Sequence, residues 1–519
     1  MRFILRPFAI IFFFVRYQCS LLFLHQKHGM RFKASYIIIL ITAVFITLMG
    51  NSCKKVKTQT VGGVLKFSVD TLKFDTIFTA AGSFTTGLLI YNPQDEEIVI
   101  SSVKLQEGTN SYFHLNVNGF AGNNVTNLKI APHDSMYVFA TVDIDPNNKL
   151  TPFIVTDSLV ATLNGRPFYL PFTAFGQNAH YIIDSALTVN AKWTKDLPYV
   201  IIWTGDTSKP RGVQINPGIQ LTLQAGCRVY MHQNASMTVF GSLVSNGTKT
   251  DSVVFQGDRL DRAYFGYIGY PGEWGGLYFD SKSSGSKLTN TIIENCGNGN
   301  LGIAAAIWVA IDSVNNSASP QLSLNNCIIQ NSYGYGIYSF GGTVVASNCL
   351  LNTTGQQALA IVLGGNDSFT NCTFANYGTA AVSHAANGTV AILDYFWDGN
   401  PRDPTYYANL NAVLRNCIVY GSLDSEIVCD TAHSPAGTQA RVYADHCLLK
   451  MGTIREPFMQ SAGTLFNRDP MFKNTANGDF HLTTGSPAIE AGTHVPGIGS
   501  DLDGTGWTDP MDIGCYKGP

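Results

Sequence analysis

An Asn-Cys dipeptide recurs through the middle of the chain, and this repeat limits the fold more than any other feature. Asparagine precedes the cysteine five times and histidine once, at Cys296, Cys327, Cys349, Cys372, Cys417 and Cys447. The successive intervals are 31, 22, 23, 45 and 30 residues. A unit near 22 residues, doubled once and twice lengthened by an inserted loop, fits no helical period and is typical of a stacked solenoid of short strands.

The residue types fit such a solenoid. Equal positions of successive coils stack about 4.8 Å apart, and cysteine is small and readily buried, so a cysteine column fills the interior. Asparagine at the preceding bend can pass amide hydrogen bonds from coil to coil. Nine cysteines follow Cys53, an odd number that argues against a disulfide framework. We expect free core thiols; the alternative, metal binding, lacks any C-x-x-C pair.

Both ends of this region resemble a known group. The run PGIQLTLQAGCRVYMHQNASMTVFGSLVSNGTKTDSVVFQGD lacks the Asn-Cys dipeptide but keeps the strand and turn pattern, and it resembles the opening coils of the pectin-lyase-like superfamily, especially its exported lipoproteins. The ending DFHLTTGSPAIEAG, DLDG and DIGCYKG resembles the same group's closing segment, although Cys515 and Lys517 depart from it. The resemblance covers about 180–519 and implies a right-handed parallel β-helix, for which we expect about 13 coils.

Residues 65–178 predict a different, smaller unit. About seven short apolar stretches, separated by turn signals such as Asn118-Gly119 and Asn164-Gly165, favour an immunoglobulin-like β-sandwich that serves as a spacer or an interaction domain. The chain is therefore expected to be all-β. The expected organisation is 1–29 over-extended gene start, 30–53 signal peptide, 54–64 tether, 65–178 sandwich, 179–475 β-helix and 476–519 closing segment.

The segment from Met30 to Cys53 predicts export. Arg31 and Lys33 precede an apolar run, and small residues lead to Cys53, as in a bacterial lipoprotein signal. Cys53 would then carry the lipid that anchors the protein to the outer membrane of a Gram-negative bacterium, on its periplasmic or its outer face. The alternative is a plain transmembrane anchor.

Charge excludes one class of partner. The whole chain has 33 basic and 36 acidic residues, but six of the basic residues and none of the acidic ones lie within residues 1–52. From Cys53 onward 27 basic residues face 36 acidic ones, a net charge of −9. Because phosphate binding needs a basic footprint, a nucleic-acid role is disfavoured.

The middle coils lack the side chains that polysaccharide cleavage needs. Catalytic relatives of the resembled group cleave acidic polysaccharides, by elimination with a Lys or Arg base or by hydrolysis with paired carboxylates. Between Lys287 and Arg402 stand 114 residues without a Lys or Arg, and the few acids there do not repeat from coil to coil.

Two loops carry the candidate functional residues. The loop 257–276 combines charged and aromatic side chains that suit sugar stacking, with Arg259, Arg262 and Glu273 as catalytic candidates if the protein is an enzyme. The insert 394–410 breaks the repeat and should project from the solenoid. In either loop the rings could instead pack on the solenoid. The ligand-binding candidates are Asp258, Asp261, Tyr264, Tyr267, Tyr270, Trp274, Tyr395 and Trp397.

No cofactor is predicted. A third candidate place is the group Asp501, Asp503, Asp509 and Asp512 near the end of the chain, where D-x-D-G resembles part of a calcium loop. Calcium is the weaker alternative, because the other ligands of such a loop are missing, and a turn that caps the solenoid fits these residues better.

These features favour a monomeric envelope lipoprotein, held to the membrane by its lipid alone, whose β-helix surface binds polysaccharide or another envelope partner without catalysis. The alternative is a divergent polysaccharide lyase or glycoside hydrolase acting on an acidic glycan. An enzyme requires Arg259 or Arg262 to meet a carboxylate in one cleft, whereas a binding protein needs only an exposed aromatic row. A purely architectural role is the third option.

Overall fold

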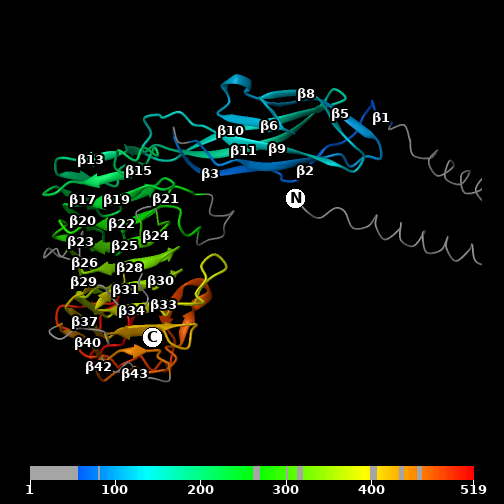
Figure 1. Cartoon of the computed structure of the whole chain (residues 1–519). Helices are drawn as coiled ribbons and strands as arrows, with labels where there is room; N and C mark the ends of the chain where they lie inside the picture. The colour runs from blue at the N-terminus through cyan, green and yellow to red at the C-terminus, as the bar shows by residue number, and fades with distance from the viewer. Residues whose placement is uncertain are drawn as a thin grey trace, which may run out of the picture.

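The computed structural model describes residues 57–79, 82–260, 269–299, 302–311, 320–397, 406–431, 438–452 and 459–519. The expected signal peptide and lipid-attachment residue, Cys53, lie outside the described residues. Figure 1 shows two bodies: a β-sandwich, and a solenoid from whose first coils the sandwich projects sideways.

Two sheets form the sandwich, and their inner faces share one apolar core. Sheet A consists, in spatial order, of β1 (Thr58–Gln59), β5 (Glu97–Leu105), β10 (Phe153–Leu163), β11 (Arg166–Gln177) and β3 (Leu72–Phe78), with β8 (Asn124–Ile130) also paired to β5. Sheet B consists of β2 (Lys66–Phe67), β4 (Thr86–Tyr91), β9 (Ser135–Val142), β6 (Phe113–Val117) and β7 (Phe120–Ala121). A short 3-10 helix, η1 (Gly108–Asn110), precedes β6. The assignment to the immunoglobulin-like class stays a prediction.

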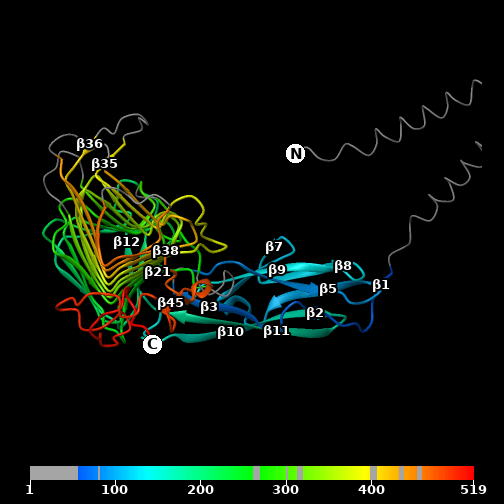
Figure 2. The same ribbon diagram turned by 90° about the horizontal axis from the view of Figure 1, so that it is seen from below.

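Residues 180–466 wind into a parallel β-helix with three sheets, which confirms the stacked solenoid that the Asn-Cys repeat predicts. Each of the first nine coils contributes a strand to sheet C, then one to sheet D, then one to sheet E, and every pairing within these sheets is parallel. Figure 2 looks along this stack of coils.

Sheet C has eleven strands: β12 (His180–Ile183), β15 (Tyr199–Ile202), β18 (Arg228–Met231), β21 (Val253–Gly257), β24 (Thr291–Cys296), β27 (Ile328–Ser332), β30 (Leu350–Thr354), β33 (Thr373–Asn376), β38 (Ile418–Gly421), β41 (Leu448–Leu449) and β43 (Leu465–Phe466). Sheet D has nine: β13 (Ser185–Leu187), β16 (Gly212–Ile215), β19 (Ser236–Val239), β22 (Leu277–Phe279), β25 (Ala305–Ala310), β28 (Tyr335–Phe340), β31 (Leu359–Val362), β34 (Val390–Leu393) and β39 (Ile427–Asp430). Sheet E has ten: β14 (Ala191–Trp193), β17 (Gln220–Gln224), β20 (Ser242–Asn246), β23 (Ser286–Thr289), β26 (Gln321–Asn325), β29 (Thr343–Ser347), β32 (Gly365–Thr370), β37 (Leu410–Arg415), β40 (Ala440–Asp445) and β42 (Met459–Ala462). With eleven strands in sheet C over the described residues, the estimate of about 13 coils was too high.

The corner between sheets E and C explains the asparagines. The residue before each column cysteine has a left-handed backbone, which asparagine tolerates far better than most side chains. The positive φ values are 52° at Asn326, 50° at Asn348, 51° at Asn371, 49° at Asn416 and 49° at His446. Amides also connect coils, as expected: Asn348 Nδ2 donates to Asn326 Oδ1 at 3.1 Å, and Asn416 Nδ2 to Asn371 Oδ1 at 3.1 Å.

The cysteine column differs from the predicted one at its beginning. Strand register places Cys296 opposite Ser332, so Cys296 does not belong to the column, and Thr291 lies next to Cys327 instead. Cys227, in a coil expected to lack the cysteine, does occupy it, followed by Val253 and Thr291. The dipeptide at residues 295–296 misled the prediction because it lies at the other end of its strand.

All nine cysteines of the described residues are buried and free, as predicted. Five of the thiols donate to backbone carbonyls two residues earlier, for example Cys349 Sγ to Ser347 O at 3.2 Å. These five belong to Cys327, Cys349, Cys372, Cys417 and Cys447. Burial raises the pKa of the Cys372 thiol well above its usual value, which keeps the group neutral and unreactive.

The last part of the chain covers a flank of the solenoid rather than only its end. It contains β44 (Phe472–Asn474), the 3-10 helix η2 (Thr475–Asn477) and β45 (Asp479–Leu482). Ile513 packs with Ile418 on the outer side of sheet C, and Lys249 Nζ, several coils away, lies 2.7 Å from Asp503 Oδ1. The expected capping turn is therefore a strap that covers outward-facing apolar side chains of sheet C.

Candidate functional site

The site lies at the corner between sheets C and D, where His232 and Asp258 project side by side. They follow β18 and β21, which pair in register at Met231 and Gly257. Backbone bonds hold both, because His232 N donates to Ile201 O at 2.8 Å and Asp258 N donates to Met231 O at 3.0 Å. His232 Nδ1 lies 2.6 Å from Asp258 Oδ2. The repeat itself thus builds this pair.

The Asp258 carboxylate influences the charge of the His232 side chain. The hydrogen bond to Asp258 raises the pKa of His232 above its ordinary value, although burial acts in the opposite sense. The imidazole is therefore held toward its positively charged form. The His232 side chain is 46% exposed against 13% for Asp258, so the histidine is the member of the pair that a ligand reaches.

Glu273 reaches the same place from a turn just before β22, at the other end of the connection that begins with Asp258. Gly272 N and Glu273 N donate to the Cys296 and Asn295 carbonyls at 3.0 and 2.9 Å, and Glu273 Oε1 accepts from Tyr270 N at 3.1 Å. Gly257 makes room for the carboxylate: a Cβ there would stand 1.9 Å from Glu273 Oε2. A glycine is therefore required at residue 257.

Two pockets open around these groups and share His232, Asp258 and Arg259. The first, the corner pocket, has a volume of about 310 Å³. Its lining consists of His232, Gln233, Asp258, Arg259, Tyr270, Gly272 and Glu273. Its side chains offer a cation, carboxylates and an exposed ring around one cavity.

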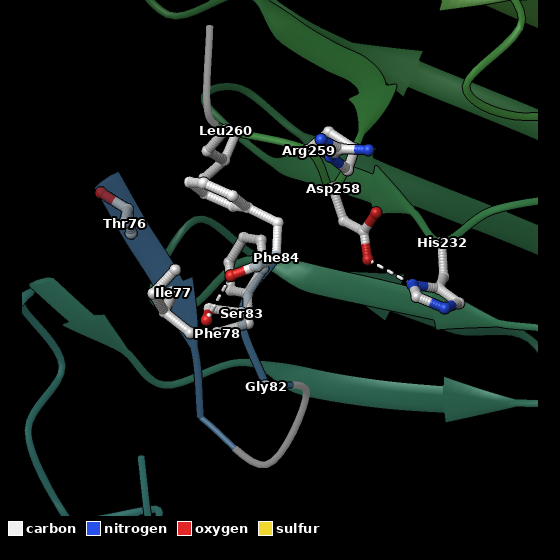
Figure 3. Close-up of a pocket in the computed structure, with 10 residues that line it drawn as sticks. All are labelled: Thr76, Ile77, Phe78, Gly82, Ser83, Phe84, His232, Asp258, Arg259 and Leu260. Carbon is white, nitrogen blue, oxygen red and sulfur yellow. Dashed lines mark hydrogen bonds and ion pairs between the residues drawn. The ribbon is translucent and has the colours of Figure 1, made fainter. Parts of the chain in front are cut away.

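The second, the junction pocket, lies between the solenoid and the sandwich and has a volume of about 240 Å³ (Figure 3). Its sandwich side comes from β3 and the segment before β4. The full lining is Thr76, Ile77, Phe78, Gly82, Ser83, Phe84, His232, Asp258, Arg259 and Leu260. The Arg259 guanidinium lies over the Phe84 ring, 5.9 Å from its centroid, and so connects the two bodies.

Direct packing holds the sandwich beside this site. Phe78 packs against Val200 and Tyr230, with the Phe78 and Tyr230 ring centroids 4.7 Å apart. Tyr181 donates its hydroxyl hydrogen bond to Thr79 O. The first coils thus hold β3, three of whose residues line the junction pocket, against the solenoid.

The structure brings together four of the candidates from the loop 257–276: Asp258, Arg259, Tyr270 and Glu273. Trp274 is a correction, because it is fully buried in the solenoid core and its Nε1 donates to Glu294 O at 2.9 Å. Its ring is closed to a ligand. The four remaining candidates of that loop, Asp261, Arg262, Tyr264 and Tyr267, lie outside the described residues.

The insert 394–410 forms a separate feature. Tyr395 and Tyr407 pair in the hairpin of β35 (Tyr395–Phe396) and β36 (Tyr406–Tyr407), labelled in Figure 2. The Tyr395 ring is 8% exposed and its hydroxyl donates to Asp430 Oδ2 at 2.8 Å, whereas Trp397 is 44% exposed. Of these two candidates, Trp397 alone presents its ring to solvent. The insert follows β34, four coils beyond β22, so it does not add to the corner pocket.

Aromatic side chains also line the outer side of sheet D next to the corner. Tyr278 and Trp308 are register partners with ring centroids 4.5 Å apart, and Tyr338 follows on the next strand. Tyr278 and Trp308 are half-buried and Tyr338 is buried. The row is partly covered rather than fully exposed.

Sequence reasoning missed His232 and every sandwich residue. His232 could have been found, since it precedes Asp258 by 26 residues, one coil with a short insertion. Phe84 could not, because no period relates a sandwich residue to a coil.

The aspartates near the C-terminus hold turns and connect segments. Asp501 Oδ1 and Oδ2 accept from Thr505 N and Lys517 N at 2.6 and 2.9 Å, and Asp512 accepts from Glu490 N and Gly518 N. Within the described ranges, no group of three or more His, Cys, Asp and Glu side chains is placed to hold a metal ion. Nor does this part of the chain contain a helix long and apolar enough to cross a membrane.

Comparisons with known proteins give no family. The chain matches no protein-family model and no curated protein. Among solved structures it is similar to the A-module of the mannuronan C-5 epimerase AlgE6 from Azotobacter vinelandii, with 10% identity over 56% of this chain and 91% of that one and a TM-score of 0.20.

Two other structures match smaller parts. A family 123 glycoside hydrolase from Clostridium perfringens has 11% identity over 22% of this chain, a TM-score of 0.16, and only 26% of its own length covered. The E. coli chaperone DraB has 12% identity over 23% of this chain and 57% of its own, with a TM-score of 0.16. Likenesses at these scores carry no argument about function.

Proposed function

We propose that this protein is a cell-envelope lipoprotein that binds an acidic polysaccharide at the corner pocket without cleaving it. The observation that supports this most is the meeting of Arg259, His232, Tyr270, Asp258 and Glu273 around one cavity. A volume of about 310 Å³ lies at the lower end of small-ligand sites, and one sugar unit of a longer chain is a suitable occupant.

Each side chain of the corner pocket can contact a different group of the sugar. The Arg259 guanidinium suits a sugar carboxylate, to which arginine can donate two parallel hydrogen bonds. His232, held toward its charged form by Asp258, adds a second positive donor. Tyr270 is 54% exposed and offers a ring face for stacking, while the Glu273 carboxylate can accept from sugar hydroxyls.

Binding is favoured over catalysis because the same geometry weakens the elements of a lyase. The carboxylate that would act as the base, Glu273, is already held by the protein, because its Oε1 accepts from Tyr270 N at 3.1 Å and its Oε2 is buried.

The envelope location rests on the sequence. Cys53 as the acylated residue, a tether over 54–64 and a sandwich that separates the anchor from the solenoid would present the corner pocket away from the membrane. The test is metabolic labelling with a fatty-acid analogue, which we expect to modify the natural protein and not a Cys53→Ala variant. Equal labelling of both would contradict the proposal.

The glycan test uses residues 54–519 and affinity electrophoresis in gels that contain alginate, polygalacturonate or a neutral glucan. We expect retardation in the acidic gels and its loss in Arg259→Ala. Arg441→Ala is the matched control, since Arg441 also lies over a ring, that of Tyr443 at 5.6 Å, but on sheet E. Equal mobility in all gels would reject the proposed function.

A second candidate is β-elimination, which the presence of Arg259 and Glu273 in one pocket favours. Arg259 would neutralise the uronate carboxylate, Glu273 would take the proton next to it, and the oxygen of the glycosidic bond would leave with a proton from His232. The chain would then release an unsaturated sugar that absorbs in the ultraviolet. Product formation that Glu273→Gln abolishes would establish this function in place of simple binding.

A further inference from the structure

The junction pocket shown in Figure 3 adjoins the corner pocket, with which it shares three lining residues, but its other walls are more apolar. The shared residues His232, Asp258 and Arg259 form the boundary between them, so a ligand held by Arg259 in one pocket is next to the other. The sandwich side of the junction pocket is mostly apolar, with Thr76 and Ser83 as its hydroxyl side chains. Ile77 and Phe78 are buried, and Leu260 packs against the cluster that contains Phe78.

The size of the junction pocket limits what enters it. Its volume of about 240 Å³ is below the range of about 300–1,000 Å³ that whole small ligands occupy. A substituent of a sugar fits this space better than a further sugar ring. Because Arg259 lines both pockets, a substituent in the junction pocket can stay attached to a chain that is held in the corner pocket.

The chemistry of the walls selects the type of substituent. On the solenoid side stand the Arg259 guanidinium and His232, which is paired with Asp258; on the sandwich side Ile77, Phe78 and the Phe84 ring lie beside the hydroxyl side chains Thr76 and Ser83. An acetyl group has one carbonyl acceptor and one methyl group, and so it matches both sides. A hydroxyl group would leave the apolar side unfilled, and a second carboxylate would bring its charge against the rings at a desolvation cost.

We propose that the junction pocket is an acetyl-binding subsite, so that the protein recognises acetylated acidic polysaccharides. Residues of the β-sandwich would contact the acetyl group. This inference rests on the proposed function, and it gives the sandwich a part in specificity beyond that of a spacer. Phe84 is the specificity-determining residue, because its ring forms part of the apolar wall and packs against the Arg259 guanidinium.

The test compares affinities for bacterial O-acetylated alginate and for the same sample after mild alkaline removal of its esters. An apolar pocket distinguishes one carbon unit by about tenfold or more, so we expect the acetylated form to bind at least about tenfold more tightly. In Phe84→Ala this ratio should approach one. Phe120→Ala is the matched control, since Phe120 is an exposed sandwich phenylalanine on β7, and its ratio should equal that of the natural protein.

A variant that fills the junction pocket provides a second test, in case Phe84→Ala fails to fold. Leu260→Phe should reduce the volume of the pocket, and we expect it to lower affinity for the acetylated polymer more than for the de-esterified one. Hyaluronan, whose acetyl groups are amide-linked, forms a second arm. Binding of hyaluronan that Phe84→Ala weakens and Phe120→Ala does not would identify the amide-linked source.

The outcomes separate the two proposals. Equal affinity for acetylated and de-esterified alginate, together with hyaluronan binding that is indifferent to Phe84, would overturn the acetyl subsite and leave the glycan-binding function standing. Absence of binding to every polymer would overturn both.

Discussion

The two corners that flank sheet C are built in opposite ways. Between sheets E and C the chain turns through a left-handed residue, then a buried cysteine, with almost no variation from Asn326 to His446. Between sheets C and D the length changes from coil to coil, and there the charged and aromatic side chains gather. The constant corner fixes the register of the coils, and the variable corner is therefore free to carry a binding site.

The constant corner should be the more sensitive to mutation, with Asn416 as its most connected member. Its backbone is left-handed. Its side-chain Nδ2 donates to Asn371 Oδ1 at 3.1 Å and to Thr493 O at 2.7 Å, and its Oδ1 accepts from Thr493 N at 2.8 Å. We expect Asn416→Val to lower the free energy of unfolding by about 4 kcal/mol, from backbone strain and lost buried hydrogen bonds. Guanidinium denaturation followed by circular dichroism measures this.

Asn416→Gly is the control for that experiment. Glycine keeps the left-handed backbone and loses only the hydrogen bonds, so the loss should be about half as large. If Asn416→Val unfolded within about 1 kcal/mol of the natural protein, the constant corner would not determine coil stability.

A buried acid in the solenoid interior should make the regular part of the fold depend on pH. Asp367 accepts from Val344 N at 2.9 Å and Ser339 Oγ at 3.3 Å, and burial raises its pKa to about 8. Because the folded pKa exceeds the unfolded one, its contribution is fully present at low pH and is lost as pH rises toward 8.

We expect stability to fall by about 2 kcal/mol between about pH 4 and about pH 8, an average of about 0.5 kcal/mol per pH unit against a limit of about 1.4 kcal/mol per unit. Asp367→Asn should remove the slope. A slope unchanged by that substitution would assign the pH dependence to other groups.

At the variable corner, the expected pH effect is on binding. The pKa of His232 is raised by its bond to Asp258, so its positive charge is present at low pH and is lost as pH rises through that raised pKa. Affinity for an acidic polysaccharide should fall by about fivefold between about pH 6 and pH 8, as titration calorimetry would show.

His232→Gln should flatten this profile. His133→Gln is the matched control, because His133 also pairs with an aspartate, Asp95 at 2.8 Å, but on the sandwich. A flat profile in the natural protein would remove His232 from ligand binding.

The smallest stability effect should be that of Tyr270→Ala. Tyr270 is 54% exposed at the variable corner, so the melting temperature should hardly change, with a loss within about 0.5 kcal/mol. Affinity for polysaccharide should nevertheless fall by about fivefold. Tyr169→Ala, an exposed tyrosine of the sandwich, should change neither quantity. A Tyr270→Ala variant that melts early but binds normally would reverse the roles assigned to the two corners.

The candidate site was partly predictable. Arg259 and Glu273 drew attention because charges and rings cluster in that loop, and the structure places both at one pocket. Trp274 belonged to the same cluster yet lies in the core, since it stands directly before the Gly275-Gly276 entry to β22 and its ring fills the coil interior. Composition shows that rings are concentrated in a loop, but it does not show which of them face solvent.

The sequence by itself determined the parallel β-helix, because every coil imposes the same local requirements on its residues. The left-handed corner selects asparagine, and the narrow interior selects cysteine and aliphatic side chains. The tertiary structure alone decided where the repeat of cysteines begins, what covers sheet C and what stands opposite Arg259. Phe84 and Arg259 are 175 positions apart in separate bodies. Such a contact depends on how two folded surfaces pack, and no period in the sequence records it.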